Sequence, residues 1–348
     1  MKSLAYGTAH TGAREVSIVC GMLSFRPLTV CVLTLMLAAG CAPGQSGATG
    51  AKRRLSIATG GTGGVFYPYG GGIAKVITDS LDNVEATAEV TAASIDNLKF
   101  IKQGTSDLAF TMSDTAQDAV LAHDVFAEFG AVPLRTLAVL YSSYTHLVTR
   151  EDSGITDLTH LKGRVVSMGA AGSGTATLGF RMLEAAGLDP KRDIRAQSLG
   201  VAQSVDALKD GKIDAFFWNG GLPTASVLDL VNTPGIKARF LPTDALLVPL
   251  EKAFGPSLYY RAIIPKGMYK QDADVPVVGV AVLLVVSETM PETLAHDITR
   301  VLFDKQVELA GIHPQARDLS LNTAVKGSPI PFHPGAIKYY RERQVWTD

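Results

Sequence analysis

The chain has 348 residues, of which 47% are hydrophobic and 19% are charged. This is the composition of a folded globular protein, and the length is sufficient for two domains with cores of their own. The formal net charge is −1 at pH 7, so the chain lacks the basic excess that neutralises phosphates, which argues against a nucleic-acid partner.

The N-terminal segment has the features of a bacterial lipoprotein signal. An apolar run over Leu28–Ala39 is too short to span a bilayer and has the length of the hydrophobic region of a signal peptide. Small residues lead into Cys41, as in a lipobox. We expect a signal peptide over residues 1–40, with Met22 as the candidate start, then a lipid on Cys41 and a flexible tether over 41–51. The alternative is a cleaved signal without a lipid.

The first folded unit is predicted to begin with a strand around Leu55 and Ile57, followed by a glycine-rich loop over 59–68. Apolar spacing then predicts a helix, with one face made of Ile73, Val76, Ile77 and Leu81. A strand, a glycine-rich turn and a helix in this order direct backbone N–H groups and a helix N-terminus at an anion.

The same unit continues with strict alternation over Val84–Thr91, which predicts a half-buried strand. Ser94 is predicted to cap the next helix, and Gly104 to end it. A further strand starts at Asp107 and ends at the pair 113–114, which can cap another helix.

The second unit repeats this order. A strand over Arg164–Met168 leads into a glycine-rich turn over 169–175. One face of the following helix is predicted to consist of Ala176, Gly179, Phe180 and Leu183. Ser204 is predicted to cap another helix, and a strand over 214–218 then leads into a polar, glycine-containing run.

A local pattern, Gly-x-x-Asp-x-x-Phe, occurs at 104–110 and again at 211–217. The repeated element order predicts two α/β lobes, each with parallel strand–helix–strand units, and places both glycine loops at carboxyl ends of strands, where ligands bind in such sheets. Two apolar segments, 137–148 and 275–286, are predicted to cross between the lobes, and helices over 290–309 and 335–343 to pack on the first lobe. Lobe one then comprises 52–142 and 279–348, and lobe two comprises 143–278.

Catalytic and metal-binding motifs are missing from the sequence. The loop at 59–68 departs from Gly-x-Gly-x-x-Gly at Phe66, and no lysine precedes Thr175 as a P-loop requires. All three cysteines lie at or before Cys41, and the seven histidines have no metal-ligand spacing, so we expect no cofactor and no metal. His146 could act as a base, but a structural role is favoured in an alternating strand.

Each candidate binding residue also has a structural interpretation. The glycines at 60–64 can form a tight turn, and the run 172–175 can be either a ligand loop or a plain N-cap. Tyr67 and Trp218 can belong to the core, and Ser94 and Asp114 can cap helices.

At these motifs the chain resembles the TAXI family, the substrate-binding proteins of TRAP transporters. The residues that carry the resemblance are 58–68, 94–98, 172–175, 216–224 and 264–276, within a similarity that covers nearly all of 52–348. Two positions depart from the family pattern, because Met112 stands where glutamine is common and Ser142-Ser143 where Pro-Glu is common.

The resemblance implies a two-lobe periplasmic binding protein fold of type II, with lobes joined by two crossing strands at a hinge. The family's ligands include glutamate and 2-oxoglutarate, so a small carboxylate or amino-acid solute is expected. The ligand-binding positions that it implies, with the neighbouring aromatic at 218, are Gly63, Gly64, Tyr67, Ser94, Asn97, Ser113, Asp114, Ser173, Gly174, Thr175, Trp218, Gly221, Leu222, Pro223 and Thr224.

We therefore expect a periplasmic solute-binding receptor, anchored to the membrane by lipid on Cys41, that hands its solute to TRAP permease subunits and is not an enzyme. Two alternatives remain open. One is a secreted α/β enzyme that acts on small carboxylates, although no nucleophile–base–orienter set is evident. The other is a surface antigen without a transport role.

Overall fold

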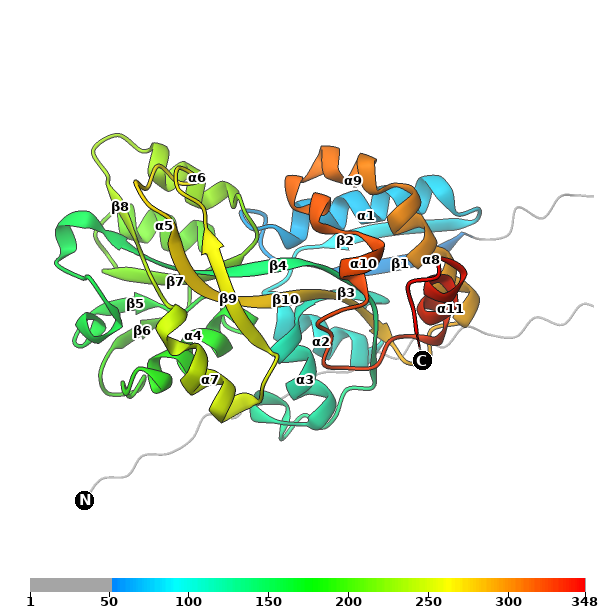
Figure 1. Cartoon of the computed structure of the whole chain (residues 1–348), viewed down its shortest axis with the longest axis horizontal. Coiled ribbons are helices and arrows are strands. Elements are labelled where there is room, and N and C mark those ends of the chain that lie inside the picture. Colours follow the sequence, from blue (N-terminus) through cyan, green and yellow to red (C-terminus); the bar gives the residue numbers. More distant parts are fainter. Residues whose placement is uncertain (1–51, 348) are drawn as a thin grey trace, which may run out of the picture. The chain divides into compact units, whose positions relative to one another are not determined.

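The computed structural model describes residues 52–347 (Figure 1). The predicted signal peptide, the lipidation site Cys41 and the tether over 41–51 lie outside the described residues. Within the described range, no helix is both long enough and apolar enough to cross a membrane.

Lobe one contains parallel strands that alternate with helices, as the sequence predicts. Its strands are β1 (Arg53–Ala58), β2 (Val84–Glu89) and β3 (Leu108–Met112), and its first helices are α1 (Phe66–Ser80), α2 (Ser94–Gln103) and α3 (Ser113–Leu121). Strand β1 pairs in parallel with both β2 and β3. The C-terminal part adds α8 (Glu292–Asp304), α9 (Gln306–Ile312), α10 (Leu321–Ala324) and α11 (Pro334–Glu342). Helices α8 and α9 both contact α1, as expected for a tail that packs on this lobe.

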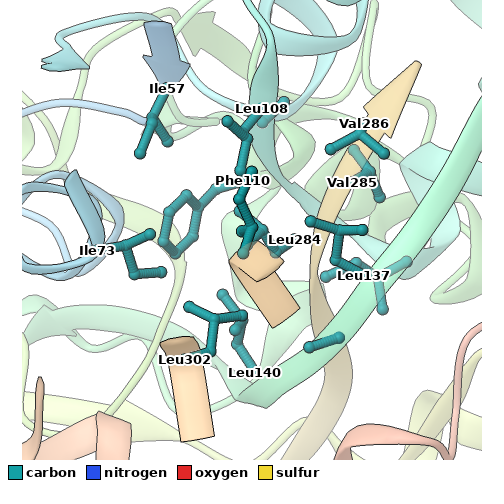
Figure 2. Packing of buried hydrophobic residues seen from close by; sticks show 14 of the residues in the cluster. Ile57, Ile73, Leu108, Phe110, Leu137, Leu140, Leu284, Val285, Val286 and Leu302 are labelled. Carbon is teal, nitrogen blue, oxygen red and sulfur yellow. The ribbon is translucent and has the colours of Figure 1, made fainter. Parts of the chain in front are cut away.

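One apolar cluster holds this lobe together. Figure 2 shows side chains from the sheet and the covering helices meeting in it, among them Ile57, Phe110, Leu284 and Leu302. Its members come from 55–141 and 281–340, so the two ends of the described chain share one core.

Lobe two repeats the arrangement. Its parallel strands are β5 (Val165–Ser167), β6 (Arg195–Gln197) and β7 (Ala215–Gly220), and its helices are α4 (Gly174–Ala185), α5 (Val201–Lys209), α6 (Ala225–Asn232) and α7 (Leu247–Phe254). Two further strands, β8 (Ala238–Leu241) and β9 (Tyr259–Ile264), complete it. Short 3-10 helices occur at η1 (Asp124–Phe126), η2 (Glu151–Ser153), η3 (Leu158–Leu161), η4 (Asp244–Leu246) and η5 (Pro314–Asp318).

Two long antiparallel strands, β4 (Leu134–Arg150) and β10 (Val275–Ser287), pass through both lobes (Figure 1). In lobe one β10 pairs with β3, and in lobe two it pairs with β9 while β4 pairs with β7 and β8. The sheet is therefore continuous, in the order β2-β1-β3-β10-β4-β7-β5-β6. The predicted two-lobe α/β class with two crossing strands is confirmed.

The repeated Gly-x-x-Asp-x-x-Phe pattern has the same structural role in each lobe. In lobe one the Asp107 carboxylate accepts a hydrogen bond from the Ser56 N–H at 2.9 Å, and the Asp107 N–H donates to the Ser56 carbonyl at 2.9 Å. In lobe two Asp214 forms the same pair of bonds with Val165, at 2.7 and 2.8 Å. Each aspartate thus fixes the register of two neighbouring parallel strands, which explains why the pattern occurs twice.

Several predicted details are wrong. Ser94 is the first residue of α2 and does not cap it, since Ala93 holds the N-cap position. Met112 occupies that position for α3, ahead of the Ser113–Asp114 pair. Ser204 lies inside α5, where its hydroxyl bonds that of Ser167 at 2.8 Å. The side chains of Ser94, Ser204 and Asp114 have partners in neighbouring elements, and local spacing does not reveal such partners.

Two predicted apolar faces also contain errors. The strand predicted over Val84–Thr91 ends at Glu89, so Val90, an apolar residue of the predicted alternation, lies beyond β2 and is 57% exposed. Phe180 is 36% exposed on α4, whereas Leu178 and Met182 on the same helix are fully buried.

Candidate functional site

A cavity of about 270 Å³ lies between the lobes, and both glycine loops line it. Lobe one contributes the loop before α1, the segment before α2, and single residues of β3 and β4. Lobe two contributes the loop before α4, the start of α5 and the end of β7. The expectation that the two loops face one cleft agrees with this geometry, and the volume suits a small solute.

The glycines allow the two lobes to approach closely. A Cβ on Gly64 would lie 2.8 Å from the Trp218 ring of the other lobe, and a Cβ on Gly174 would lie 2.9 Å from the hydroxyl oxygen of Ser94. A Cβ on Gly63 would collide with the Ser226 hydroxyl. The φ angles of these three glycines lie outside the left-handed region. Glycine is therefore needed at these three positions because a side chain would not fit at the contact between the lobes.

Hydrogen bonds also connect the lobes at the cavity rim. The Gly172 carbonyl accepts from the N–H groups of Ile95 and Asp96, the second and third residues of α2, at 3.0 and 3.2 Å. The Ser226 hydroxyl donates to the Gly63 carbonyl at 3.1 Å. The structure is thus a closed arrangement, in which the N-terminus of α2 is engaged by the opposite lobe.

Two residues that line the cavity carry a buried polar group without a hydrogen-bond partner among the described residues. These groups are the Asn219 side-chain nitrogen and the Tyr141 hydroxyl, in residues that are 5% and 3% exposed. The Thr145 hydroxyl donates to the Asn219 Oδ1 at 2.6 Å, which holds the amide in place and leaves its Nδ2 as the free end. Buried polar groups are normally bonded, so unpaired ones beside a cavity indicate a ligand site.

The hydroxyls at the cavity differ in what they can offer. Ser94 Oγ accepts from the Met112 N–H at 3.1 Å, and Thr175 Oγ1 accepts from the Asn219 N–H at 3.2 Å. Each retains its proton for a ligand. Ser173 instead caps α4, because its Oγ accepts from the Ala176 N–H at 3.2 Å and donates to the Ala170 carbonyl at 2.7 Å. The plain N-cap interpretation therefore holds for Ser173.

The first two N–H groups of α4 are also available. Gly174 and Thr175 begin this helix, where backbone N–H groups have no intrahelical partner, and both residues line the cavity. A helix N-terminus of this kind favours a negative charge by about 0.3–1 kcal/mol.

The predicted binding residues separate into two groups. Those that line the cavity are Gly64, Ser94, Ser173, Gly174, Thr175 and Trp218. Those that do not line it are Gly63, Tyr67, Asn97, Ser113, Asp114, Gly221, Leu222, Pro223 and Thr224. In place of Tyr67, its neighbour Phe66 reaches the cavity.

Asn97 connects the lobe-one strands behind the site. Its side-chain nitrogen donates to the carbonyls of Thr59 and Phe110 at 2.7 and 2.8 Å, and its Oδ1 accepts from the Thr91 hydroxyl at 2.6 Å. The residue is fully buried. All of its strong bonds are internal, so it positions the glycine loop and the end of β3.

Asp114 belongs to a buried ionic cluster between α3 and α4. Its carboxylate accepts from the Tyr259 hydroxyl at 3.0 Å and lies 3.8 Å from Arg181, which also donates to Asp118 at 2.6 Å. Burial raises the pKa of Asp114, and it raises the pKa of Asp118 to about 6. The cluster joins the two lobes outside the cavity lining.

Neither Asn219 nor Tyr141 is among the binding residues predicted from the sequence. Asn219 could have been predicted from the sequence, since it is a polar residue near the carboxyl end of a parallel strand, where ligands bind in such sheets. Tyr141 could not have been predicted in this way, because an aromatic residue in an apolar crossing strand looks like a core residue.

His146 has a structural role. It is fully buried, its Nδ1 lies 2.8 Å from the Tyr144 carbonyl, and its ring packs against Tyr269 and Phe240. It does not line the cavity. Burial lowers its pKa from 6.5 to about 4.

This lowered pKa predicts a loss of stability in mild acid. The folded protein keeps His146 neutral while the unfolded chain takes up a proton, so the stabilisation present above pH 6.5 falls as the pH drops toward 4. Between pH 7 and 5.5 we expect the unfolding free energy to fall by about 1 kcal/mol less in His146→Gln than in the wild type. Urea unfolding at both pH values measures this. The half-exposed His160 provides the control, and equal losses in His146→Gln and His160→Gln would contradict the assignment.

Solved structures share this architecture. A protein from Bordetella bronchiseptica RB50 is 19% identical, with 84% of this chain and 89% of that chain covered and a TM-score of 0.51. The periplasmic aliphatic sulphonate binding protein SsuA from Escherichia coli is 19% identical over 83% of each chain, with a TM-score of 0.46. A putative L-cystine ABC transporter protein from Listeria monocytogenes is 14% identical, covering 75% and 94%, with a TM-score of 0.47.

At these identities the likeness is one of fold. The two lobes and the two linking strands form the periplasmic binding protein fold of type II, as the sequence predicts. A family model described as the NMT1-like family matches residues 57–343, nearly the whole of the described range. The chain therefore belongs to the NMT1-like family.

Proposed function

We propose that this protein is the solute-binding receptor of a transporter, which captures a small carboxylate between its lobes. The observation that carries the proposal is the interlobe cavity with two buried, unpaired donors, Asn219 Nδ2 and Tyr141 Oη. The free protons of Ser94 and Thr175 and the N-terminus of α4 add further donors from both lobes. Closure excludes water and strengthens hydrogen bonds to an anion.

The transporter in this proposal is of the TRAP type, because the motifs at the glycine loops and at 216–224 resemble its TAXI receptors. The receptor acts in the periplasm, held to the membrane by lipid on Cys41. It has no catalytic step in this proposal, since His146 and Asp114, the groups that an enzyme would need, make internal bonds outside the cavity lining.

A ligand is expected to raise the melting temperature of the folded part. Residues 52–348 lie within one compact unit, so they can be produced without the signal and tether. A solute at one hundred times its Kd stabilises the folded state by about 2.7 kcal/mol, which corresponds to a rise of about 5 °C for a chain of this size. A thermal-shift screen of monocarboxylates, dicarboxylates, 2-oxo acids and amino acids measures this rise.

The variants Ser94→Ala and Thr175→Val are expected to lose most of the rise. Thr289→Val, at an exposed threonine far along the chain in lobe one, serves as the control and is expected to retain it. If no carboxylate raises the melting temperature, the proposed function is contradicted. Turnover of a carboxylate that depends on His146 or Asp114 would instead favour the enzyme.

A further inference from the structure

The cavity is free of formal charge. Its lining consists of glycine and alanine, apolar and aromatic side chains, serine and threonine, one glutamine, one asparagine and one tyrosine. No lysine, arginine, histidine, aspartate or glutamate of the described residues belongs to it. A solute with several charges would therefore leave water without a counter-charge, which is costly in a closed site.

The free polar groups at the cavity are donors. The Asn219 amide nitrogen can only donate, and the Tyr141 hydroxyl has no partner for its proton. The hydroxyls of Ser94 and Thr175 each accept from a backbone N–H and keep a proton to donate. This number of donors is sufficient for one anionic head group, which they would hold as backbone amides and hydroxyls hold an oxyanion. An ammonium group would meet no carboxylate.

Apolar side chains provide the remaining wall. Val65 and Met112 of lobe one are 1% and 2% exposed, Val201 of lobe two is 6% exposed, and the rings of Phe66 and Trp218 complete the surface. Removal of apolar surface from water stabilises binding in proportion to the area buried. This wall therefore favours an apolar body on the solute.

On the basis of the proposed function, we infer that the solute is a monocarboxylate with an apolar body, and neither an amino acid nor a dicarboxylate. The carboxylate accepts from Asn219, Tyr141 and the hydroxyls of Ser94 and Thr175, and the body packs on the aromatic wall. This ligand class differs from the one that the family resemblance implies, since glutamate and 2-oxoglutarate both carry two carboxylates. Asn219 and Tyr141 are the specificity-determining residues, because they are buried and have no other partner.

Calorimetric titration with two matched sets of compounds tests the inference. The first set is 4-methylpentanoate, leucine, 2-methylglutarate and 4-methylpentanamide, which respectively carry the acid alone, an added ammonium, a second carboxylate and no charge. The second set is 3-phenylpropanoate, phenylalanine and 3-phenylpropanamide. We expect the monocarboxylate of at least one set to bind at least tenfold more tightly than every other member of its set.

The outcomes separate the inference from the function. Tighter binding of leucine, phenylalanine, 2-methylglutarate, glutamate or 2-oxoglutarate overturns the inference and leaves carboxylate capture standing. Equal binding of an acid and its amide overturns the requirement for an anion. If no carboxylate of any kind binds, the proposed function itself is overturned.

Tyr141→Phe gives a second, independent test. The substitution removes only a hydroxyl without a partner, so folding stability is expected to stay unchanged while affinity for the monocarboxylate falls about tenfold. Tyr339→Phe is the matched control, because its hydroxyl is also buried and unpaired but lies on α11, outside the cavity lining. If Tyr141→Phe and Tyr339→Phe bind the monocarboxylate as the wild type does, the assigned head-group contact is wrong.

Discussion

Arg181→Met is expected to lower the free energy of unfolding by about 3–5 kcal/mol, because it removes the only positive charge of a buried ionic cluster. The guanidinium is 6% exposed and meets Asp114, Asp118 and Asp124, all on the α3–η1 side of the contact between the lobes. It also bonds the Tyr259 hydroxyl at 3.1 Å. Without it, Asp114 remains fully buried with no compensating charge.

Urea unfolding at pH 7 measures the effect. Arg300→Met is the control, since Arg300 on α8 pairs with Asp297 and Asp304 on an exposed helix surface, and such pairs contribute about 0–1 kcal/mol. A loss in Arg181→Met no larger than that in Arg300→Met would show that the cluster does not stabilise the fold.

Gly174→Ala is expected to weaken solute binding about tenfold to a hundredfold while leaving the fold intact. The glycine is the first residue of α4, where alanine is well tolerated, but its Cβ would lie 2.8 Å from the Met112 sulfur and 2.9 Å from the Thr115 hydroxyl of the opposite lobe. Overpacking of this kind costs about 1–3 kcal/mol. Because the clash is with the opposite lobe, it makes closure of the lobes around the solute less favourable.

Gly71→Ala is the matched control, because Gly71 is also helical but a Cβ there has nothing within 4 Å. Calorimetry for affinity and thermal unfolding for stability give the two quantities. Equal affinity in both variants would show that the lobes do not need to approach as closely as the structure has them. If Gly174→Ala lowers the melting temperature and Gly71→Ala does not, the added methyl group destabilises the fold itself and not only the closed arrangement.

Elements with strong periodicity could be predicted from the sequence. The apolar spacing of Ile73, Val76 and Ile77 identified α1, and an apolar segment and a β-branched run identified the two crossing strands. Burial on one face or on both leaves a direct trace in the sequence. The two glycine loops were also recognisable, and they do line one cavity. The reason for their glycines was not evident, since close approach to the other lobe is a tertiary property.

The roles of single polar residues could not be predicted in the same way. Ser94, Ser173 and Thr175 look alike in sequence, but only the structure shows that Ser173 uses its hydroxyl within its own loop. Asn97 lies in the first turn of a helix, as a binding residue could, although its bonds hold three segments of lobe one together. Tyr141 was missed for the opposite reason, because its place in an apolar strand looks like core, although the residue lines the cavity and its buried hydroxyl has no hydrogen-bond partner.

The central claim, solute capture in the interlobe cavity, is tested most directly by the fluorescence of Trp218. The chain has two tryptophans, and Trp346 packs on Phe332 at the C-terminal end, so Trp346→Phe leaves Trp218 as the single reporter. Titration of this variant with the solute that gives the largest thermal shift is expected to change Trp218 emission, saturating at the calorimetric Kd. Calorimetric binding without any change in Trp218 emission would place the solute elsewhere and contradict the account.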